Sequence, residues 1–428
     1  MAAKMSRVDL LVHSASQLVT CASPDGPRRG SAMGEAGVIA DGALAIQGGR
    51  IVAVGPSEEL LARYVAEDEL DATGCVVCPG FVDPHTHAVY AGDRVDEFER
   101  RIRGESYQQI AAAGGGILST VRATRAAAVP SIVEQSLARL DEMLNLGTTT
   151  VEVKTGYGLD AACEMKLLRA IDRLDRTGPF ELVPTFMAAH AVPPEFAGRA
   201  DAYVEFVVEE LLPAACAWYE GSAIQADGRP MFVDVFCETH AFDLAQTRRV
   251  LEAGRAAGMP LKAHVDQFTA SGGLELAIEL GAISVDHLDQ TGAAGIRALA
   301  ASSAVGVVIP TASFNLGATK FADARAMIDA GAAIALTTDI NPGSSPCPSM
   351  PLAMAIACRY QKLSPAEALV AGTINAAHAI GLGDRVGSLE PGKQADLLML
   401  DAPDYRHLAY QFGGNLVVKV VKKGGIVV

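Results

Sequence analysis

The chain has 428 residues, too many for one ordinary domain, and 50% of them are hydrophobic, so a large core can be buried. Its formal net charge of −15 argues against nucleic acid and against an anionic membrane surface as partners. The start of the chain lacks the apolar core of a secretory signal, and no later apolar run is long enough to span a membrane. The eight cysteines are scattered through apolar segments, which suits reduced thiols, and we expect a cytoplasmic protein.

The first part of the chain alternates short apolar runs with turn residues, as antiparallel strands do. Such runs occur at residues 10–12, 43–46 and 50–55, the last two being separated by Gly48-Gly49. The C-terminal end repeats the pattern in residues 387–400 and 416–428. We therefore predict a small β-sandwich built from both chain ends, residues 1–78 and residues 385–428.

The middle of the chain, residues 79–384, alternates buried β-like runs with helical stretches rich in alanine and leucine. The run at 75–78 is expected as the first strand, and the others are expected at 148–153, 182–187, 232–236, 261–263, 282–285, 305–309 and 333–336. Eight strands with helices between them are what a (β/α)8 barrel of the TIM type requires. The predicted fold class is therefore α/β, with this barrel as the catalytic domain.

Polar residues follow these strands at the points where a barrel has its catalytic face. His85 and His87 come after the first strand, and in extended backbone their imidazoles point to the same side. By themselves they could equally be structural histidines. The later strands add Lys154, Tyr157, His190, Glu238, His264, His287 and Asp339 at the same rim. So many potential metal ligands at one rim favour a divalent-metal site.

The sequence resembles the amidohydrolase superfamily of metal-dependent hydrolases over its whole length. The resemblance is carried by His85-Thr86-His87, His264, His287 and Thr338-Asp339. Further motifs lie at 91–94, 106–107, 114–117, 154–159, 189–193, 233–238, 338–343 and 410–414. These motifs are similar to a branch that opens the cyclic amide of 4-imidazolone-5-propanoate with a metal-activated water. The product of that reaction is N-formimidoyl-L-glutamate, an intermediate of histidine degradation.

The resemblance implies a metal site formed by His85, His87, His264 and Asp339. This site is expected to hold one Zn²⁺ or Fe²⁺/Fe³⁺ per subunit, and ligand type alone does not choose between zinc and iron. Binuclear relatives carry a bridging lysine after the fourth strand, where this chain has Phe236-Cys237-Glu238. One metal is therefore expected, and Lys154 is expected to form a structural ion pair.

Three residues have implied catalytic roles. His287 would hydrogen-bond the attacking water or polarise the target carbonyl, although it could instead orient a metal ligand. Asp339 would receive the proton of the water and pass it to the leaving nitrogen. Gln267 occupies the position of a proton-shuttling glutamate in deaminases of the superfamily. Because an amide cannot ionise, Gln267 is expected to orient the substrate by hydrogen bonds.

The expected substrate is a small anionic heterocycle, and its propionate needs a cation. Arg94 lies in the loop after the first strand, and a guanidinium can bind a carboxylate through two hydrogen bonds. The resemblance also implies substrate or product contacts for Tyr107, Tyr157, His190, Asn341, Gly343 and Ser344. We expect a homodimer.

Two other functions remain open on the sequence alone. A deaminase or deiminase acting on a related heterocycle or a formimino substrate would release ammonia, and Gln267 opposes it. A non-catalytic scaffold protein would be expected to have lost metal ligands, and all four are present here.

Overall fold

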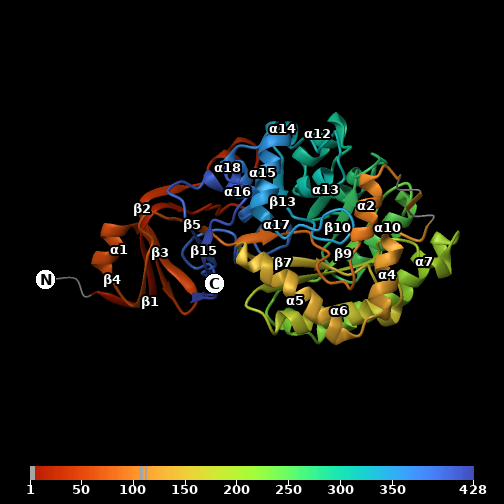
Figure 1. Ribbon diagram of the computed structural model, residues 1–428, viewed down its shortest axis with the longest axis horizontal. Coiled ribbons are helices and arrows are strands. Elements are labelled where there is room, and N and C mark those ends of the chain that lie inside the picture. Colours follow the sequence, from red (N-terminus) through yellow and green to blue (C-terminus); the bar gives the residue numbers. More distant parts are fainter. Residues whose placement is uncertain (1–4, 106–108, 111–112) are drawn as a thin grey trace.

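Eight short parallel strands form the centre of the larger part of the molecule (Figure 1). The computed structural model describes residues 5–105, 109–110 and 113–428. The strands are β6 (Phe81–Asp83), β7 (Thr148–Lys154), β8 (Glu181–Ala189), β9 (Phe232–Val235), β10 (Lys262–Val265), β11 (Ser284–His287), β12 (Val305–Val308) and β13 (Ala333–Leu336). Backbone hydrogen bonds join them in the orders β6-β7-β8-β9 and β10-β11-β12-β13. All their residues are buried, as expected for parallel strands covered on both faces.

The two half-barrels meet at both of their seams. On one side, a parallel bridge pairs Val233 with Leu261 and so brings β9 beside β10. On the other side, the Thr338 hydroxyl after β13 donates to the Asp83 carboxylate at the end of β6, at 2.6 Å. The parallel sheet is therefore curled into a barrel, as predicted.

Helices surround these strands and connect them in sequence (Figure 1). They are α2 (Val95–Ile102), α4 (Ile117–Ala126), α5 (Val129–Asn145), α6 (Ala161–Asp175), α7 (Ala200–Phe206), α8 (Leu212–Glu220), α9 (Ala223–Ala226), α10 (Leu244–Ala256), α11 (Gly273–Glu279), α12 (Ala293–Ala301), α13 (Pro310–Asn315), α14 (Ala324–Asp329), α15 (Met350–Tyr360), α16 (Pro365–Ala371) and α17 (Ile374–Ala379). Short helical turns lie at Gly30–Gly34, Pro194–Phe196 and Val207–Leu211. In the part of the chain that the structure describes, none of the helices has the length and apolar character that crossing a membrane requires.

One end of the barrel is closed by apolar side chains. The cluster there includes the first residues of β9, β12 and β13, which are Phe232, Val305 and Ala333. Ala376 of α17 and Leu382 after it belong to the same cluster. Because these are the amino ends of the strands, the polar residues gather at the opposite, carboxyl end.

Both chain ends form one further sheet beside the barrel (Figure 1). Its strands are β1 (Ser6–Val19), β2 (Val38–Gln47), β3 (Arg50–Pro56), β4 (Tyr64–Asp71), β5 (Val76–Pro79), β14 (Leu397–Leu400), β15 (Val417–Lys422) and β16 (Gly425–Ile426). They are hydrogen-bonded in the order β16-β15-β14-β5-β1-β2-β3, with β4 beside β1. Helix α1 (Ser57–Arg63) packs against this sheet, whereas α18 (His407–Tyr410) packs against α15 and α16. The two ends thus combine as expected, whereas the division of this sheet into the two layers of a sandwich stays a prediction.

The prediction for the first barrel strand was wrong. The run at 75–78 falls in β5, which pairs with β1 and β14 in the terminal sheet, and the barrel begins with β6. The chain passes from one sheet to the other at Gly80, where an added Cβ would lie 2.4 Å from the Thr149 hydroxyl oxygen. Both short strands are fully buried, so hydrophobicity alone could not assign them to different sheets.

Candidate active site

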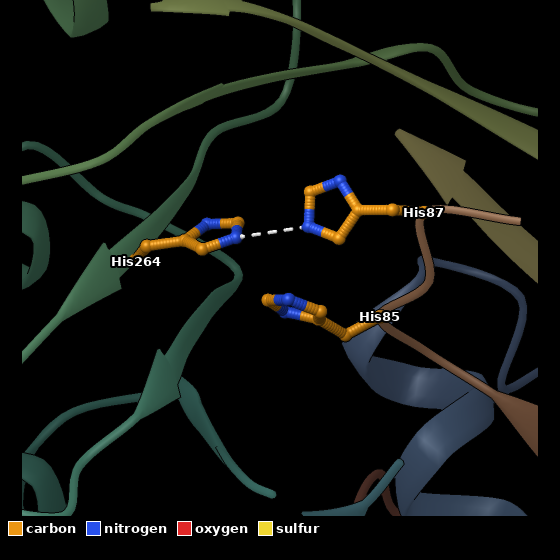
Figure 2. A group of neighbouring side chains, drawn as sticks. All are labelled: His85, His87 and His264. Atoms are coloured by element: carbon orange, nitrogen blue, oxygen red, sulfur yellow. Dashed lines mark hydrogen bonds between the residues drawn. The ribbon is translucent and has the colours of Figure 1, made fainter. Parts of the chain in front are cut away.

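Three histidines from two strand ends converge at the carboxyl end of the barrel (Figure 2). His85 and His87 follow β6, and His264 lies within β10. One ligand atom from each lies within 4.8 Å of those of the other two. The Nε2 atoms of His87 and His264 are 3.5 Å apart, the separation drawn in Figure 2. Two atoms that bind the same ion at about 2 Å are up to about 4 Å apart, so this spacing fits a shared metal.

Carboxylates orient two of these rings. Asp286 at the end of β11 accepts a hydrogen bond from Nδ1 of His85 at 2.6 Å. Asp234 in β9 accepts one from Nδ1 of His264 at 3.1 Å. A proton held on Nδ1 leaves the Nε2 lone pair free to bind a metal.

The electrostatics of the histidines also suit a metal. Burial lowers the pKa of both His85 and His87 well below the usual histidine value, so both rings are neutral, as metal ligands must be. Nε2 of His85 is buried and has no hydrogen-bond partner among the described residues. A buried polar atom without a partner is rare, and a bound ion would satisfy it.

A lysine occupies the centre of the layer beneath these ligands. Asp234, His264 and Asp286 form a second cluster of potential metal ligands, but the Lys154 ammonium already lies among them. It is 2.8 Å from Asp234, 2.7 Å from Glu152 and 3.6 Å from Asp286. Burial opposes its charge, but the attraction of these carboxylates outweighs burial and raises the pKa of Lys154. The structural ion pair expected for Lys154 is thus confirmed.

Asp339 lies beside the histidines near the start of the loop after β13. Its Oδ1 atom is 3.6 Å from Nε2 of His85 and 4.0 Å from Nε2 of His87. Its backbone has a φ of 49°, a left-handed conformation that is unfavourable for a residue other than glycine. Such strain is concentrated at functional sites. Asp339 does not belong to the cluster of three histidines, and its place as the fourth ligand stays a prediction.

His287, the last residue of β11, packs against the same cluster. Its ring centroid is 5.1 Å from that of His264 and 5.3 Å from that of His85. Its φ of 84° is again left-handed. Among the described residues, Nδ1 of His287 has no hydrogen-bond partner although it is buried. The ring is therefore available to a ligand in the cavity.

A cavity of about 970 Å³ opens above the histidines. It brings together nearly all of the residues expected at the site: His87, Arg94, Tyr157, His190, His264, Gln267, His287, Asp339, Asn341, Gly343 and Ser344. His85 lies fully buried behind this wall. Tyr107 lies outside the described residues.

Two glutamates hold the cavity loops in place by accepting backbone hydrogen bonds. The sequence did not predict this role for either of them. Glu238, after β9, accepts hydrogen bonds from the backbone N–H groups of Phe268 at 2.9 Å and Thr269 at 3.0 Å. It thereby holds the loop that carries Gln267. Glu164, in the first turn of α6, accepts from the N–H groups flanking Tyr157, including Gly158 at 2.8 Å. Glu164 could have been identified from the sequence as an acidic residue in the first turn of the helix that follows the glycine-rich loop around Tyr157.

Asn341 has a different environment from the one expected for a substrate contact. Its Oδ1 atom accepts from the N–H groups of Gly343 and Ser344, both at 2.8 Å. Its Nδ2 atom donates to the Asp339 carbonyl at 2.8 Å and to the Ser344 hydroxyl at 2.9 Å. An amide side chain has two donors and two acceptor positions, so all four are used within this turn.

Arg94 lines the cavity but already has a carboxylate partner. Its Nε and Nη2 atoms both donate to Oε2 of Glu97, at 2.9 Å and 2.7 Å. One of the two edges of the guanidinium that can bind a carboxylate through two hydrogen bonds, Nε with Nη2, is therefore occupied by Glu97.

Comparisons with known proteins agree with this geometry. The amidohydrolase family model matches residues 76–427, and a model for an imidazolonepropionase-like composite domain of bacteria matches residues 42–64. An imidazolonepropionase from Chloroflexus aggregans is 61% identical over 99% of both chains. One from Herpetosiphon aurantiacus is 51% identical over 99% of this chain and 98% of that protein.

Solved structures of low identity show the same fold. A zinc-bound adenosine deaminase from Xanthomonas campestris has a TM-score of 0.72 at 20% identity, covering 99% of this chain and 93% of that one. Guanine deaminase from E. coli has a TM-score of 0.70 at 16% identity, covering 98% of each chain. Likeness at this level establishes the architecture alone.

Proposed function

The chain belongs to the amidohydrolase family and, within it, to the imidazolonepropionases, and on that premise we propose that it hydrolyses 4-imidazolone-5-propanoate to N-formimidoyl-L-glutamate in histidine degradation. The observation that carries the proposal is the convergence of three histidines at a cavity that is also lined by Arg94 and Arg101. Such a cavity can hold both a metal and an anionic group.

We propose that His85, His87, His264 and Asp339 hold one metal ion. Zn²⁺ and Fe²⁺/Fe³⁺ both fit a set of imidazoles with one carboxylate. When bound, the ion lowers the pKa of a water molecule so that hydroxide is available near neutral pH. The Lys154 ammonium supports the choice of one ion, because it occupies the centre of the only other cluster of potential ligands found among the described residues.

The reaction adds water across the cyclic amide. A C–O bond forms at the ring carbonyl, the C–N bond breaks, and the carbonyl becomes a carboxylate. Asp339 accepts the proton of the attacking water and delivers it to the leaving nitrogen. His287 donates a hydrogen bond to the carbonyl oxygen, where negative charge develops. No hydrogen bond joins His287 to His85 or His264 among the described contacts, which favours this role over orienting a ligand.

The remaining residues bind and orient the substrate. Gln267 faces the cavity and hydrogen-bonds the ring, Arg94 donates a hydrogen bond to the propionate, and Tyr157 and His190 pack against the heterocycle. His190 stacks on His87 with a centroid distance of 4.7 Å. Burial lowers the pKa of His190 to about 3, so it acts as a neutral hydrogen-bonding group. The remaining proposed contacts are Tyr107, Gly343 and Ser344, together with Asn341, which would act at the substrate by fixing the turn that carries Gly343 and Ser344.

The wider setting belongs to the same proposal. The segments 1–78 and 385–428 would form one small domain, and 79–384 the catalytic barrel. We also propose a cytoplasmic homodimer whose ligand is a small anionic heterocycle, with neither nucleic acid nor a membrane as partner.

Product analysis tests the activity. Purified enzyme incubated with 4-imidazolone-5-propanoate should form N-formimidoyl-L-glutamate without releasing ammonia, whereas adenosine and guanine should remain unchanged. Ammonia release from a purine, together with an intact imidazolone ring, would replace this proposal with a deaminase.

A further inference from the structure

The charges in the part of the cavity lined by α2 are mostly cancelled by ion pairs. Arg94 and Glu97 form one such pair, and their side chains are only 15% and 11% exposed. The other oxygen of Glu97 accepts hydrogen bonds from the Gly116 N–H and the Ser119 hydroxyl, both at 3.0 Å. The Arg94–Glu97 pair is thus firmly held and has no net charge to offer an anion.

A second acidic residue of the cavity wall is neutralised in the same way. Glu105 lines the cavity, and its Oε2 atom accepts from Nε and Nη2 of Arg100 at 2.9 Å and 2.6 Å. Neither carboxylate is therefore left to compensate another cation nearby.

Arg101 is that other cation. It is half-buried, it lines the cavity, and its Nη2 atom donates to the Gly343 carbonyl at 3.2 Å. Within residues 5–105, 109–110 and 113–428, no carboxylate lies within ion-pair distance of it. Burial, with the charge of Arg94, lowers the pKa of Arg101, but a guanidinium remains charged. A partly desolvated cation is costly when no carboxylate among the described residues compensates its charge, and an anionic ligand would do so.

Gly343 brings the two guanidinium groups to the same place. Arg101 donates to its carbonyl oxygen, while Nη1 of Arg94, the nitrogen that Glu97 does not use, would lie 2.2 Å from a Cβ at this position. Only a residue without a side chain leaves this space open. A carboxylate entering there would meet Nη1 of Arg94 and the guanidinium of Arg101 together.

We propose that Arg101 is a specificity-determining residue that supplies the net positive charge binding the propionate of the substrate, with Nη1 of Arg94 as a second donor. This inference rests on the proposed function, because it takes the propionate as the anion. The overall charge of −15 makes a local source of positive charge necessary. Arg101 thus selects for a carboxylate-bearing ring over a neutral one.

The test compares the natural substrate with its uncharged propanamide analogue in the metal-loaded enzyme. Arg101→Gln should lower kcat/KM for the acid by about 10- to 100-fold, mainly through KM, since a charge-assisted hydrogen bond is lost. For the amide, kcat/KM should change by less than about 3-fold, as no charge pair is lost. Arg101→Lys should restore part of the loss for the acid, because a point charge remains.

Arg103→Gln is the matched control. Arg103 lies just after α2, is 72% exposed and pairs with Glu99, so its replacement removes the same charge outside the cavity. It should leave the kinetics of both substrates unchanged. Metal content and melting temperature report whether each variant is folded.

Two results would overturn this inference and leave the proposed function standing. One is an unchanged KM for the acid in Arg101→Gln. The other is an equal loss of kcat/KM for the acid and the amide, which would indicate a structural role through Gly343. Wild-type enzyme that fails to open the imidazolone ring would instead overturn the proposed function, and the inference with it.

Discussion

The ammonium nitrogen of Lys154 lies 2.8 Å from Oδ2 of Asp234, and both side chains are completely buried. The same carboxylate accepts a hydrogen bond from His264, and Lys154 also lies 3.6 Å from the Asp286 oxygen that His85 uses. One lysine thus connects the carboxylates that orient two of the three clustered histidines. Metal binding and the folding of the barrel interior therefore depend on the same buried charges.

Replacing Lys154 by methionine should weaken metal binding. Asp234 would lose its compensating lysine, and Asp286 would keep only Lys262, at 3.7 Å. Disturbing the partners of metal ligands typically costs about 10- to 100-fold in affinity. Removing one member of a buried ion pair should also lower the free energy of unfolding by about 3–5 kcal/mol. Titration of the metal-free protein with Zn²⁺ in the presence of a competing chelator measures the affinity.

Lys422→Met is the control for this experiment. Lys422 is also buried and pairs with two carboxylates, Glu181 and Asp396, each at 2.7 Å, but it lies in β15 of the terminal sheet. It should destabilise the fold to a similar degree and leave zinc affinity unchanged. Equal losses of affinity in both variants would mean that Lys154 acts only through stability.

Removing Arg94 should raise KM more than it lowers kcat. Arg94→Ala removes one donor for the propionate and also leaves the Glu97 carboxylate without its cation beside the same space. We expect kcat/KM to fall by about 30-fold or more, as for other truncated charge pairs. The double variant Arg94→Ala/Glu97→Gln should recover part of this loss, because the repelling carboxylate is gone. A double variant no better than the single one would show that Glu97 does not repel the substrate.

A methyl group at Gly343 should impair substrate binding without affecting the metal. Its Cβ would lie 2.2 Å from Nη1 of Arg94, so the guanidinium would have to move. Steady-state kinetics of Gly343→Ala should show a higher KM at normal metal content. Gly413→Ala serves as the control, since a Cβ there meets nothing within 4 Å. Normal KM in Gly343→Ala would show that the position of Arg94 is not important for binding.

Gln267→Glu should not create aminohydrolase activity. Glu238 would still fix the loop through Phe268 and Thr269, and the arginines would still favour a substrate with a carboxylate. Ammonia release from guanine and cytosine should stay at the wild-type background. Substantial release from either base would mean that a single proton-carrying group separates the two activities on this scaffold.

The alternation of strands and helices was sufficient to predict the barrel, because the parallel strands are short, fully buried runs separated by helical stretches. It could not separate β5 from β6, which are both buried and only one residue apart. Strand ends were also shifted by a few residues, so that His264 and His287 lie within β10 and β11 instead of after them.

The side chains that face the cavity could be predicted because they follow strands in order. The ion pairs that these charged side chains form could not be predicted. Arg94 and Glu97 are three residues apart at the start of a helix, a common spacing for an ion pair. The sequence does not say that Arg101 has no ion pair among the residues that the structure describes. The left-handed backbone of Asp339 and His287 likewise depends on the packing of the completed barrel.

The central claim is that one metal ion per chain makes this enzyme a hydrolase of 4-imidazolone-5-propanoate. Its most direct test is the initial rate of N-formimidoyl-L-glutamate formation while chelator-treated, metal-free enzyme is titrated separately with Zn²⁺ and with Fe²⁺. The rate should start near zero, rise in proportion to the added metal and become constant at one equivalent per chain. Full activity in the metal-free enzyme, or a rate that rises until two equivalents are bound, would contradict the account.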